Sequence, residues 1–211
     1  MNSEDFGAYH ESILDKEVRK TGGVYYTPPL IVDYMVAESV GEFLQNKTPD
    51  EAAKLKSVDP ACGGGVFLLG AYQFLLDWHE RYFGKLTLAK RRKILTSNIF
   101  GVDIDPLAVE ITKYCLSMKC SEGKDFSLDI ASNVRCGNAL IDTDSFDWQR
   151  DFSHVFKQGG FDIVIGSKFH RLRMSRGQQV CVSLLLDIFL FFDTSSGVTG
   201  CRGIYERNVR H

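Results

Sequence analysis

The sequence predicts an α/β fold built on a parallel, doubly wound sheet. Four short apolar segments of strand length alternate with longer segments whose apolar residues recur at helical spacing. We expect the strands at the start of the segment 57–68, at 99–103, within 133–140 and at 161–166. Because crossovers between parallel strands are right-handed by default, the carboxyl ends of these strands should line one crevice.

Bulk composition indicates a single domain of ordinary character. The 211 residues carry a net charge of -2, without the basic excess typical of a protein that holds nucleic acid unaided. The six cysteines form no C-x-x-C pair, the five histidines lack ligand-like spacing, and the N-terminus has no apolar signal core. We therefore expect a cytoplasmic protein with no metal site. The 13-residue apolar run at 180–192 is too short to span a bilayer, so it predicts a buried strand or helix and no membrane partner.

The first helix is expected to begin at a pair of prolines. Thr27 precedes Pro28 and Pro29, so its backbone is pushed toward an extended shape and its side chain can cap the helix. Apolar residues then recur at helical spacing. They predict an apolar face made by Leu30, Tyr34, Ala37, Gly41 and Leu44, with Ile31 and Met35 beside them.

Two further helices follow from local patterns. Residues 66–83 are apolar almost all round, which is typical of a helix buried against a sheet. Asp105 as N-cap and Pro106 in the first turn begin the other helix. Its expected apolar stripe consists of Leu107, Ile111, Tyr114, Cys115 and Met118. Between the two helices, the basic run 90–93 is interpreted as a solvated helix face, with a phosphate contact as the alternative.

A glycine-rich turn joins the first strand to the helix at 66–83. Gly63, Gly64 and Gly65 permit positive φ and leave no Cβ in the turn, so backbone amides can approach a ligand at the electropositive start of the helix. Asp59, at the end of the strand, adds an acid that suits an amine. The methionine end of S-adenosylmethionine carries an ammonium and a carboxylate, and it fits both features. A purely structural turn is the alternative.

A nicotinamide dinucleotide fits this turn less well. Leu68 occupies the third glycine position of a G-x-G-x-x-G fingerprint, and Asp103, the next acid at a strand end, follows Asp59 by 44 residues. Asp103 is placed where its two oxygens can bind a ribose diol, with a simple turn carboxylate as the alternative. Asn138, in the turn after the third strand, should reach the same crevice.

Five segments occur in an order that resembles a known family. They are GGVYYTPP, DPACGGGVFL, IFGVDIDP, GNAL and FDIVIG, and the similarity covers about residues 19–166. This series resembles the adenine-specific DNA methyltransferases of restriction-modification systems, especially the Eco57I-type modification methylases. The resemblance implies a Rossmann-like S-adenosylmethionine-dependent methyltransferase sheet, of which this chain supplies about the first four parallel strands.

The same resemblance implies roles for individual residues in cofactor binding. It places Thr27 and Pro28 near the methionine carboxylate, and Asp103 on the ribose. Other implied positions surround the methionine moiety (Asp59, Ala61, Cys62, Gly63 and Gly65) or the adenine ring (Ile104, Asn138, Ala139 and Leu140).

The sequence departs from this family directly after FDIVIG. Where the family has Asn-Pro-Pro-Tyr, this chain has Ser167, Lys168, Phe169 and His170. An adenine amino group is a poor nucleophile because its lone pair is delocalised, so the Asn side chain and a Pro carbonyl accept its hydrogen bonds while the Tyr stacks on the flipped base. Lys168 puts a flexible cation in place of a rigid proline. We therefore expect little or no transfer activity at these catalytic positions.

Composition also changes after Gly166. Residues 167–211 carry one Lys and six Arg, and their net charge is +4 against -6 for residues 1–166. We therefore divide the chain into the N-terminal portion of a methyltransferase domain, 1–166, and an atypical tail, 167–211. An out-of-frame or otherwise aberrant reading is the expectation for the tail, with a diverged enzyme as the alternative.

Three functions remain open from the sequence. The first is the N-terminal portion of a DNA adenine methyltransferase whose transfer is impaired. Without a recognition domain its DNA binding should be weak or absent, and a restriction-system partner or a C-terminal half would complete it. The second is a methyltransferase acting on protein glutamine or RNA, against which YYTPP argues. The third is a non-catalytic cofactor-binding remnant, which the altered stretch 167–170 favours.

Overall fold

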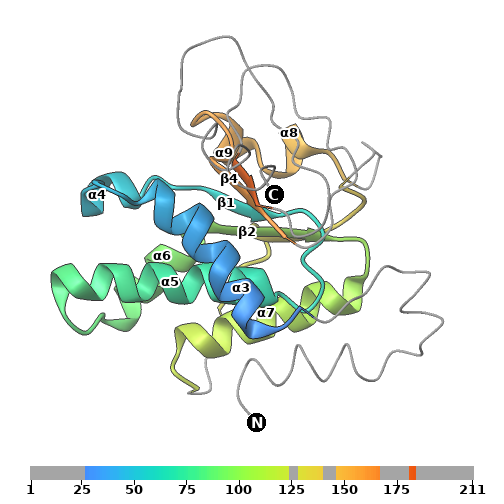
Figure 1. Cartoon of the computed structure of the whole chain (residues 1–211). Helices are drawn as coiled ribbons and strands as arrows, with labels where there is room; N and C mark the ends of the chain where they lie inside the picture. Colours follow the sequence, from blue (N-terminus) through green and yellow to red (C-terminus); the bar gives the residue numbers. More distant parts are fainter. Residues whose placement is uncertain (1–26, 124–127, 140–145, 167–180, 184–211) are drawn as a thin grey trace, which may run out of the picture.

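The computed structural model describes residues 27–123, 128–139 and 146–166, and the backbone of residues 181–183 (Figure 1). No helix within these residues is long and apolar enough to cross a membrane. The elements in chain order are α3 (Pro29–Val36), the π-helix η1 (Ala37–Gly41), α4 (Pro49–Ala52), β1 (Ser57–Asp59), α5 (Val66–Phe83), α6 (Leu88–Asn98), β2 (Ile99–Asp103), α7 (Pro106–Cys120), β3 (Val134–Cys136), α8 (Trp148–Asp151), α9 (Ser153–Phe156), β4 (Ile163–Ile165) and β5 (Cys181–Ser183).

Five parallel strands form one sheet in the order β3-β2-β1-β4-β5. The central strand is β1, in which Val58 pairs with Phe100 of β2 on one side and Val164 of β4 on the other. This arrangement confirms the predicted α/β class and all four predicted strands. The fifth strand, β5, pairs with β4 and lies in the 13-residue apolar run, where the sequence predicts a strand or a helix.

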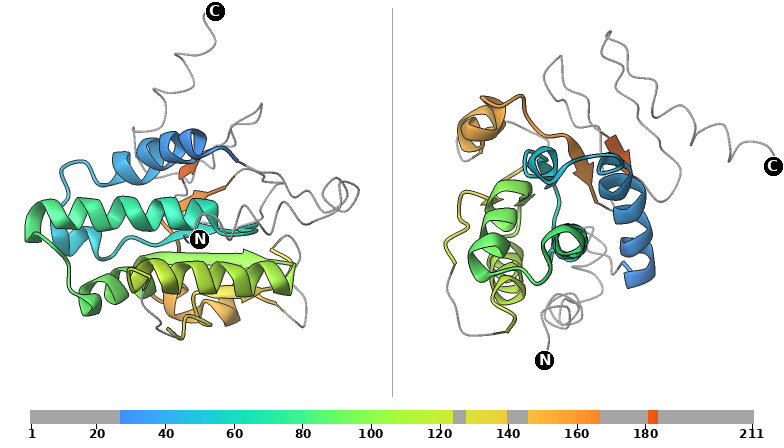
Figure 2. Two further views of the ribbon diagram at one scale, coloured as in Figure 1. Left: turned by 90° about the horizontal axis from the view of Figure 1, so that it is seen from below. Right: turned by 90° about the vertical axis from the view of Figure 1, so that its left-hand side faces the viewer.

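Helices cover both faces of the sheet. One face carries α3, α5, α6 and α7, and the other carries α8 and α9 (Figure 1, Figure 2). Side chains alternate between the two layers, so Ile99 belongs to the larger helical core and Phe100 to the aromatic core on the α8 and α9 side. In that aromatic core, Phe152 and Phe161 make edge contacts with the Phe100 ring. Burial on both faces explains why the strands are nearly continuous apolar segments in the sequence.

The helix after the glycine turn lies directly on β2. A Cβ at Gly101 would lie 2.7 Å from Leu68 Cδ1 and 3.2 Å from Cys62 Sγ, so only glycine leaves room for this contact. α5 runs over the predicted range, and Leu68 within it is fully buried. The close contact fixes the start of α5, and with it the glycine turn, relative to the carboxyl end of β2.

The structure corrects the predicted start and buried face of the first helix. Pro28 occupies the N-cap position and no side chain of a described residue caps this end, so the prediction that Thr27 caps the helix is wrong. Leu30 and Tyr34 are 78% and 58% exposed, although both belong to the predicted apolar face. The helix packs so closely on α5 that a Cβ at Gly70 would lie 2.8 Å from a methyl of α3. Because α3 packs this closely on α5, the side of α3 that carries Val32, Met35 and Val36 is the buried one.

The start of α7 is as predicted, but its buried face is not. The Asp105 side chain accepts a hydrogen bond from Leu107 N at 2.9 Å, which confirms the predicted N-cap. Leu107 and Tyr114 are about half exposed, whereas Cys115 is buried as expected. The helix packs against α5, α6 and the sheet through mostly small side chains, which permit a close approach. The buried residues are Ala108, Val109, Thr112, Cys115, Leu116, Ser117 and Cys120.

The basic run 90–93 is exposed except for Arg91, which is 8% exposed. Arg91 Nε donates to Cys120 O at 2.8 Å, and Nη2 donates to Lys119 O at 2.7 Å. Its Nη1 lies 3.6 Å from Glu122 Oε1. One guanidinium therefore binds the last carbonyls of α7, where a cation is also favoured by the helix dipole. The prediction of a solvated helix face is confirmed for Lys90, Arg92 and Lys93, and it is wrong for Arg91.

We expect Arg91→Met to lower the free energy of unfolding by about 2–3 kcal/mol, because it removes two charged hydrogen bonds to carbonyls, one buried and one partly buried. Arg92→Met is the matched control on the same helix, since Arg92 is exposed, and it should change stability by less than about 0.5 kcal/mol. Urea unfolding followed by circular dichroism measures both. Equal losses in the two variants would contradict the capping role.

Candidate functional site

The glycine turn is fastened to the neighbouring strand by backbone hydrogen bonds. Cys62 N donates to Val102 O of β2 at 2.9 Å, and Gly65 N donates back to Cys62 O at 2.8 Å. Gly65 is the N-cap of α5, and its carbonyl accepts the helical bond from Leu69 N at 2.8 Å. The chain thus leaves β1, touches β2 and enters α5 within six residues.

Two glycines of the turn are required for different reasons. Gly63 has a φ of 51° and Gly65 a φ of 82°, a region that other residues rarely adopt. A Cβ at Gly65 would lie 2.9 Å from both Thr112 Oγ1 and Cγ2, so the turn is packed against α7 there. A Cβ at Gly63 would meet no atom within 4 Å. The backbone at Gly63 therefore borders open space, where a ligand can approach it.

Asp103 closes the turn from the end of β2. Its Oδ2 accepts a hydrogen bond from Gly63 N at 2.7 Å, and its Oδ1 accepts one from Asp105 N at 2.9 Å. The sequence predicts that both oxygens bind a ribose diol. In the structure each oxygen already holds one backbone N–H, so each keeps one further acceptor position.

Asp59 is a buried acid that has no counterion among the described residues. Its side chain is 2% exposed, and Oδ1 accepts a hydrogen bond from Ala61 N at 3.0 Å. Burial raises the pKa of Asp59 to about 8, the Ala61 N–H opposes this rise, and the charge of Asp103 adds to it. Asp59 forms no ion pair with any residue that the structure describes. Such a site favours a ligand that brings a positive charge.

Cys62 is not a nucleophile in this arrangement. Its side chain is 4% exposed, and burial raises the pKa of the thiol well above its usual value. The nearby carboxylates of Asp59 and Asp103 raise the pKa further. The thiol therefore stays protonated and serves to pack the turn against Gly101 of β2.

Thr112 of α7 completes the site, and motif-based reasoning misses it. Thr112 is fully buried, its Oγ1 donates to Gly63 O at 2.7 Å, and its side chain fills the space beside Gly65. A single Thr within an apolar helical stretch offers no motif. The one indication in the sequence is a polar residue next to a predicted apolar stripe, which points to a specific hydrogen-bond partner only once the fold is known.

The other predicted residues lie around this centre. Thr27 and Pro28 lie at the start of α3, which packs on α5. Ile104 follows Asp103 and is 69% exposed, and Asn138 lies in the turn after β3 and is partly exposed. Ala139 packs against the aromatic core, and its carbonyl accepts a hydrogen bond from Trp148 Nε1 at 3.0 Å. The predicted positions Leu140, Ser167, Lys168, Phe169 and His170 lie outside the described residues.

A family comparison supports the resemblance that the motifs indicate. Residues 97–167 match the family described as Eco57I restriction-modification methylase. The chain resembles the restriction-modification methylases. The Type II restriction enzyme and methyltransferase RM.Eco57I of Escherichia coli is 28% identical over 183 residues, which cover 74% of this chain and 18% of that protein. The adenine-specific methyltransferase PglX of Streptomyces coelicolor is 33% identical over 140 residues, covering 63% of this chain and 11% of that protein.

The chain therefore spans less than a fifth of the length of these methylases.

Solved structures agree on the fold. The ATP-dependent Type ISP restriction-modification enzyme LlaBIII bound to DNA matches 79% of this chain with a TM-score of 0.56 and 16% identity, over 12% of that chain. A DrdV–DNA complex matches 78% with the same TM-score and identity, over 16% of that chain. The predicted resemblance and the predicted fold class are both confirmed.

We expect Thr112→Val to loosen the glycine turn without creating a cavity, because valine keeps the shape and loses the hydrogen bond to Gly63 O. The free energy of unfolding should fall by about 1–2 kcal/mol. The matched control is Thr96→Val, since Thr96 Oγ1 also donates to a backbone carbonyl, that of Arg92, but on the exposed side of α6. Chemical denaturation measures both variants. A Thr112→Val protein as stable as the control would contradict a clamping role for this hydroxyl.

The raised pKa of Asp59 leads us to expect that the free energy of unfolding falls as the pH rises. Its folded pKa, about 8, exceeds the unfolded value of about 4, so the native state holds this proton more tightly. The resulting stabilisation is present below about pH 4 and is lost as the pH rises through about 8, at roughly 1.4 kcal/mol for each pKa unit. We expect Asp59→Asn, which keeps an acceptor for Ala61 N, to unfold with a flatter pH profile. The same substitution at exposed Asp129 should leave the slope unchanged, and parallel profiles for Asp59→Asn and the native chain would refute the assignment.

Proposed function

We propose that this chain is the cofactor-binding part of an adenine-specific DNA methyltransferase of a restriction-modification system, which transfers a methyl group from S-adenosylmethionine to the exocyclic amine of adenine. The observation that carries the proposal is the buried Asp59, which forms no ion pair with any described residue, in the same turn as the open backbone of Gly63. The similarity to restriction-modification methylases supports the choice of DNA as the substrate.

The residues present fit S-adenosylmethionine. This cofactor would supply an activated methyl group on a sulfonium sulfur. Asp59 would pair with its ammonium, because a cation relieves the cost of a buried carboxylate. Asp103 offers one remaining acceptor position on each oxygen, which matches two ribose hydroxyls. The exposed Ile104 side chain next to Asp103 suits the flat face of an adenine ring.

The remaining predicted contacts belong to the same proposal. Thr27 and Pro28 would lie near the methionine carboxylate, and Asn138 would bind the edge of the adenine ring. Ala139 is held by Trp148, which would fix the backbone of this turn for the ring. In the positions of Asn-Pro-Pro-Tyr, Ser167 keeps an acceptor in place of the Asn and His170 keeps an aromatic ring in place of the Tyr, so we propose that the chain binds the cofactor and transfers the methyl group poorly.

Calorimetric titration with S-adenosylmethionine tests the proposed binding. We expect Asp103→Ala to weaken binding about tenfold to a hundredfold, since it removes charge-assisted hydrogen bonds to the ligand and the fastening of Gly63. Asp129→Ala is a matched control, because the exposed Asp129 makes the same kind of local bond, to Ala131 N at 3.0 Å. Equal affinities for the two variants would place the ribose elsewhere.

Incubation with labelled cofactor separates the three candidate functions. Unmethylated DNA, an unmodified protein mixture and unmodified RNA would be offered in parallel to the 211-residue chain. We expect slow labelling of adenine in DNA and none in the other two. Labelled protein or RNA would overturn the DNA assignment, and saturable binding without any labelled product would favour the non-catalytic remnant.

A further inference from the structure

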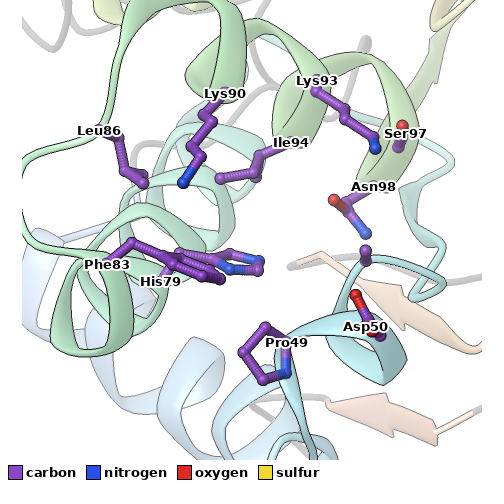
Figure 3. A pocket seen from close by; sticks show the side chains of 11 residues that line it. Pro49, Asp50, His79, Phe83, Leu86, Lys90, Lys93, Ile94, Ser97 and Asn98 are labelled. Carbon is purple, nitrogen blue, oxygen red and sulfur yellow. The ribbon is translucent and has the colours of Figure 1, made fainter.

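A cavity lies at the other end of α5 from the glycine turn. It has a volume of about 150 Å³, is partly open to solvent and is lined mainly by side chains of α4, α5 and α6 (Figure 3). Its lining combines apolar groups such as Phe83 and Ile94 with polar groups from α6. None of these residues belongs to the proposed cofactor site.

Two buried polar atoms of this cavity have no hydrogen-bond partner within the described part of the chain. They are His79 Nε2 and Asn98 Oδ1, on residues that are 5% and 1% exposed. The orientation of the Asn98 amide is fixed, because its Nδ2 donates to Ala52 O at 3.1 Å and Leu55 O at 2.6 Å. Its oxygen must therefore accept from something else. Buried acceptors are nearly always satisfied, so the cavity calls for a donor.

The charges around the cavity favour an anion. Lys90 and Lys93 come from successive turns of α6, and Asp50 is the only acid among the described residues of the lining. Lys90 Nζ lies 4.0 Å from the centre of the Phe83 ring, and Lys93 forms no ion pair with any described residue. Burial, followed by the charge of Lys90, lowers the pKa of His79, so this imidazole is neutral near pH 7. The local charge is therefore +1.

We propose that this cavity binds a small planar monoanion, the size of one aromatic ring, that also carries a hydrogen-bond donor. A hydroxy-substituted aromatic carboxylate has this chemistry. Its carboxylate would pair with Lys93, its donor would reach Asn98 Oδ1, and its ring would lie against Phe83. The size follows from the volume, because a protein cavity of about 150 Å³ accepts benzene. Asp50 disfavours a dianion, so inorganic phosphate should bind poorly.

The test is a titration of the whole chain with 4-hydroxybenzoate, followed by calorimetry and by the imidazole nitrogen signals of His79. We expect one saturable site, a shift of the His79 signals, and binding about tenfold weaker for 4-hydroxybenzyl alcohol, which lacks the charge. Lys93→Met should weaken binding about tenfold. Arg92→Met, the neighbouring exposed cation outside the lining, should leave it unchanged.

Three results would overturn the proposal. The first is no saturable binding at millimolar probe, which would mean that water alone satisfies Asn98 and His79. The second is an equal effect of Lys93→Met and Arg92→Met, which would place the probe elsewhere. The third is phosphate binding as tightly as 4-hydroxybenzoate. None of these results bears on S-adenosylmethionine binding, so the two proposals fail independently.

Discussion

The site depends on the hydrogen bonds that hold the glycine turn against β2. Cys62 N binds the backbone of β2, and Gly63 N binds the side chain of Asp103 at its end. A turn of glycines has no side-chain contacts to stabilise it, and glycine loses more conformational entropy on folding than any other residue. Neighbouring elements hold it instead, with α7 contributing Thr112 from the other side. Asp103 therefore both shapes the turn and presents acceptors to a ligand.

Asp59 is a group whose ionised form opposes folding. A carboxylate that is almost completely buried, with one backbone N–H and no cation from the described chain, is more favourable when protonated. Its position at the end of the central strand cannot relax toward solvent, because β2 and β4 flank that strand. Asp59 therefore holds a proton near pH 7, and a cationic ligand would favour its ionised form by supplying the missing charge. Strongly perturbed acids of this kind cluster at functional sites.

Sequence reasoning locates the elements better than it orients them. The bounds of α5 and β2 and the cap at Asp105 are correct, because glycine, proline and capping acids act locally. The faces of α3 and α7 are wrong at Tyr34 and Tyr114, because a buried face depends on which neighbours a helix meets. The acids of the site were predicted from their places at strand ends. Thr112 was not, because its partner at Gly63 is distant in sequence and is brought close only by the packing of α7.

The contact between β2 and α5 links two positions that are distant in the chain. Gly101 has no side chain, and Leu68 occupies the space that a methyl group would need. In any chain that shares this sheet, a larger residue in place of Gly101 would require a smaller residue in place of Leu68. Otherwise α5 would have to move away from β2, and the glycine turn would move with it. The two positions should therefore change together across related sequences, and a substitution at either one alone should be rare.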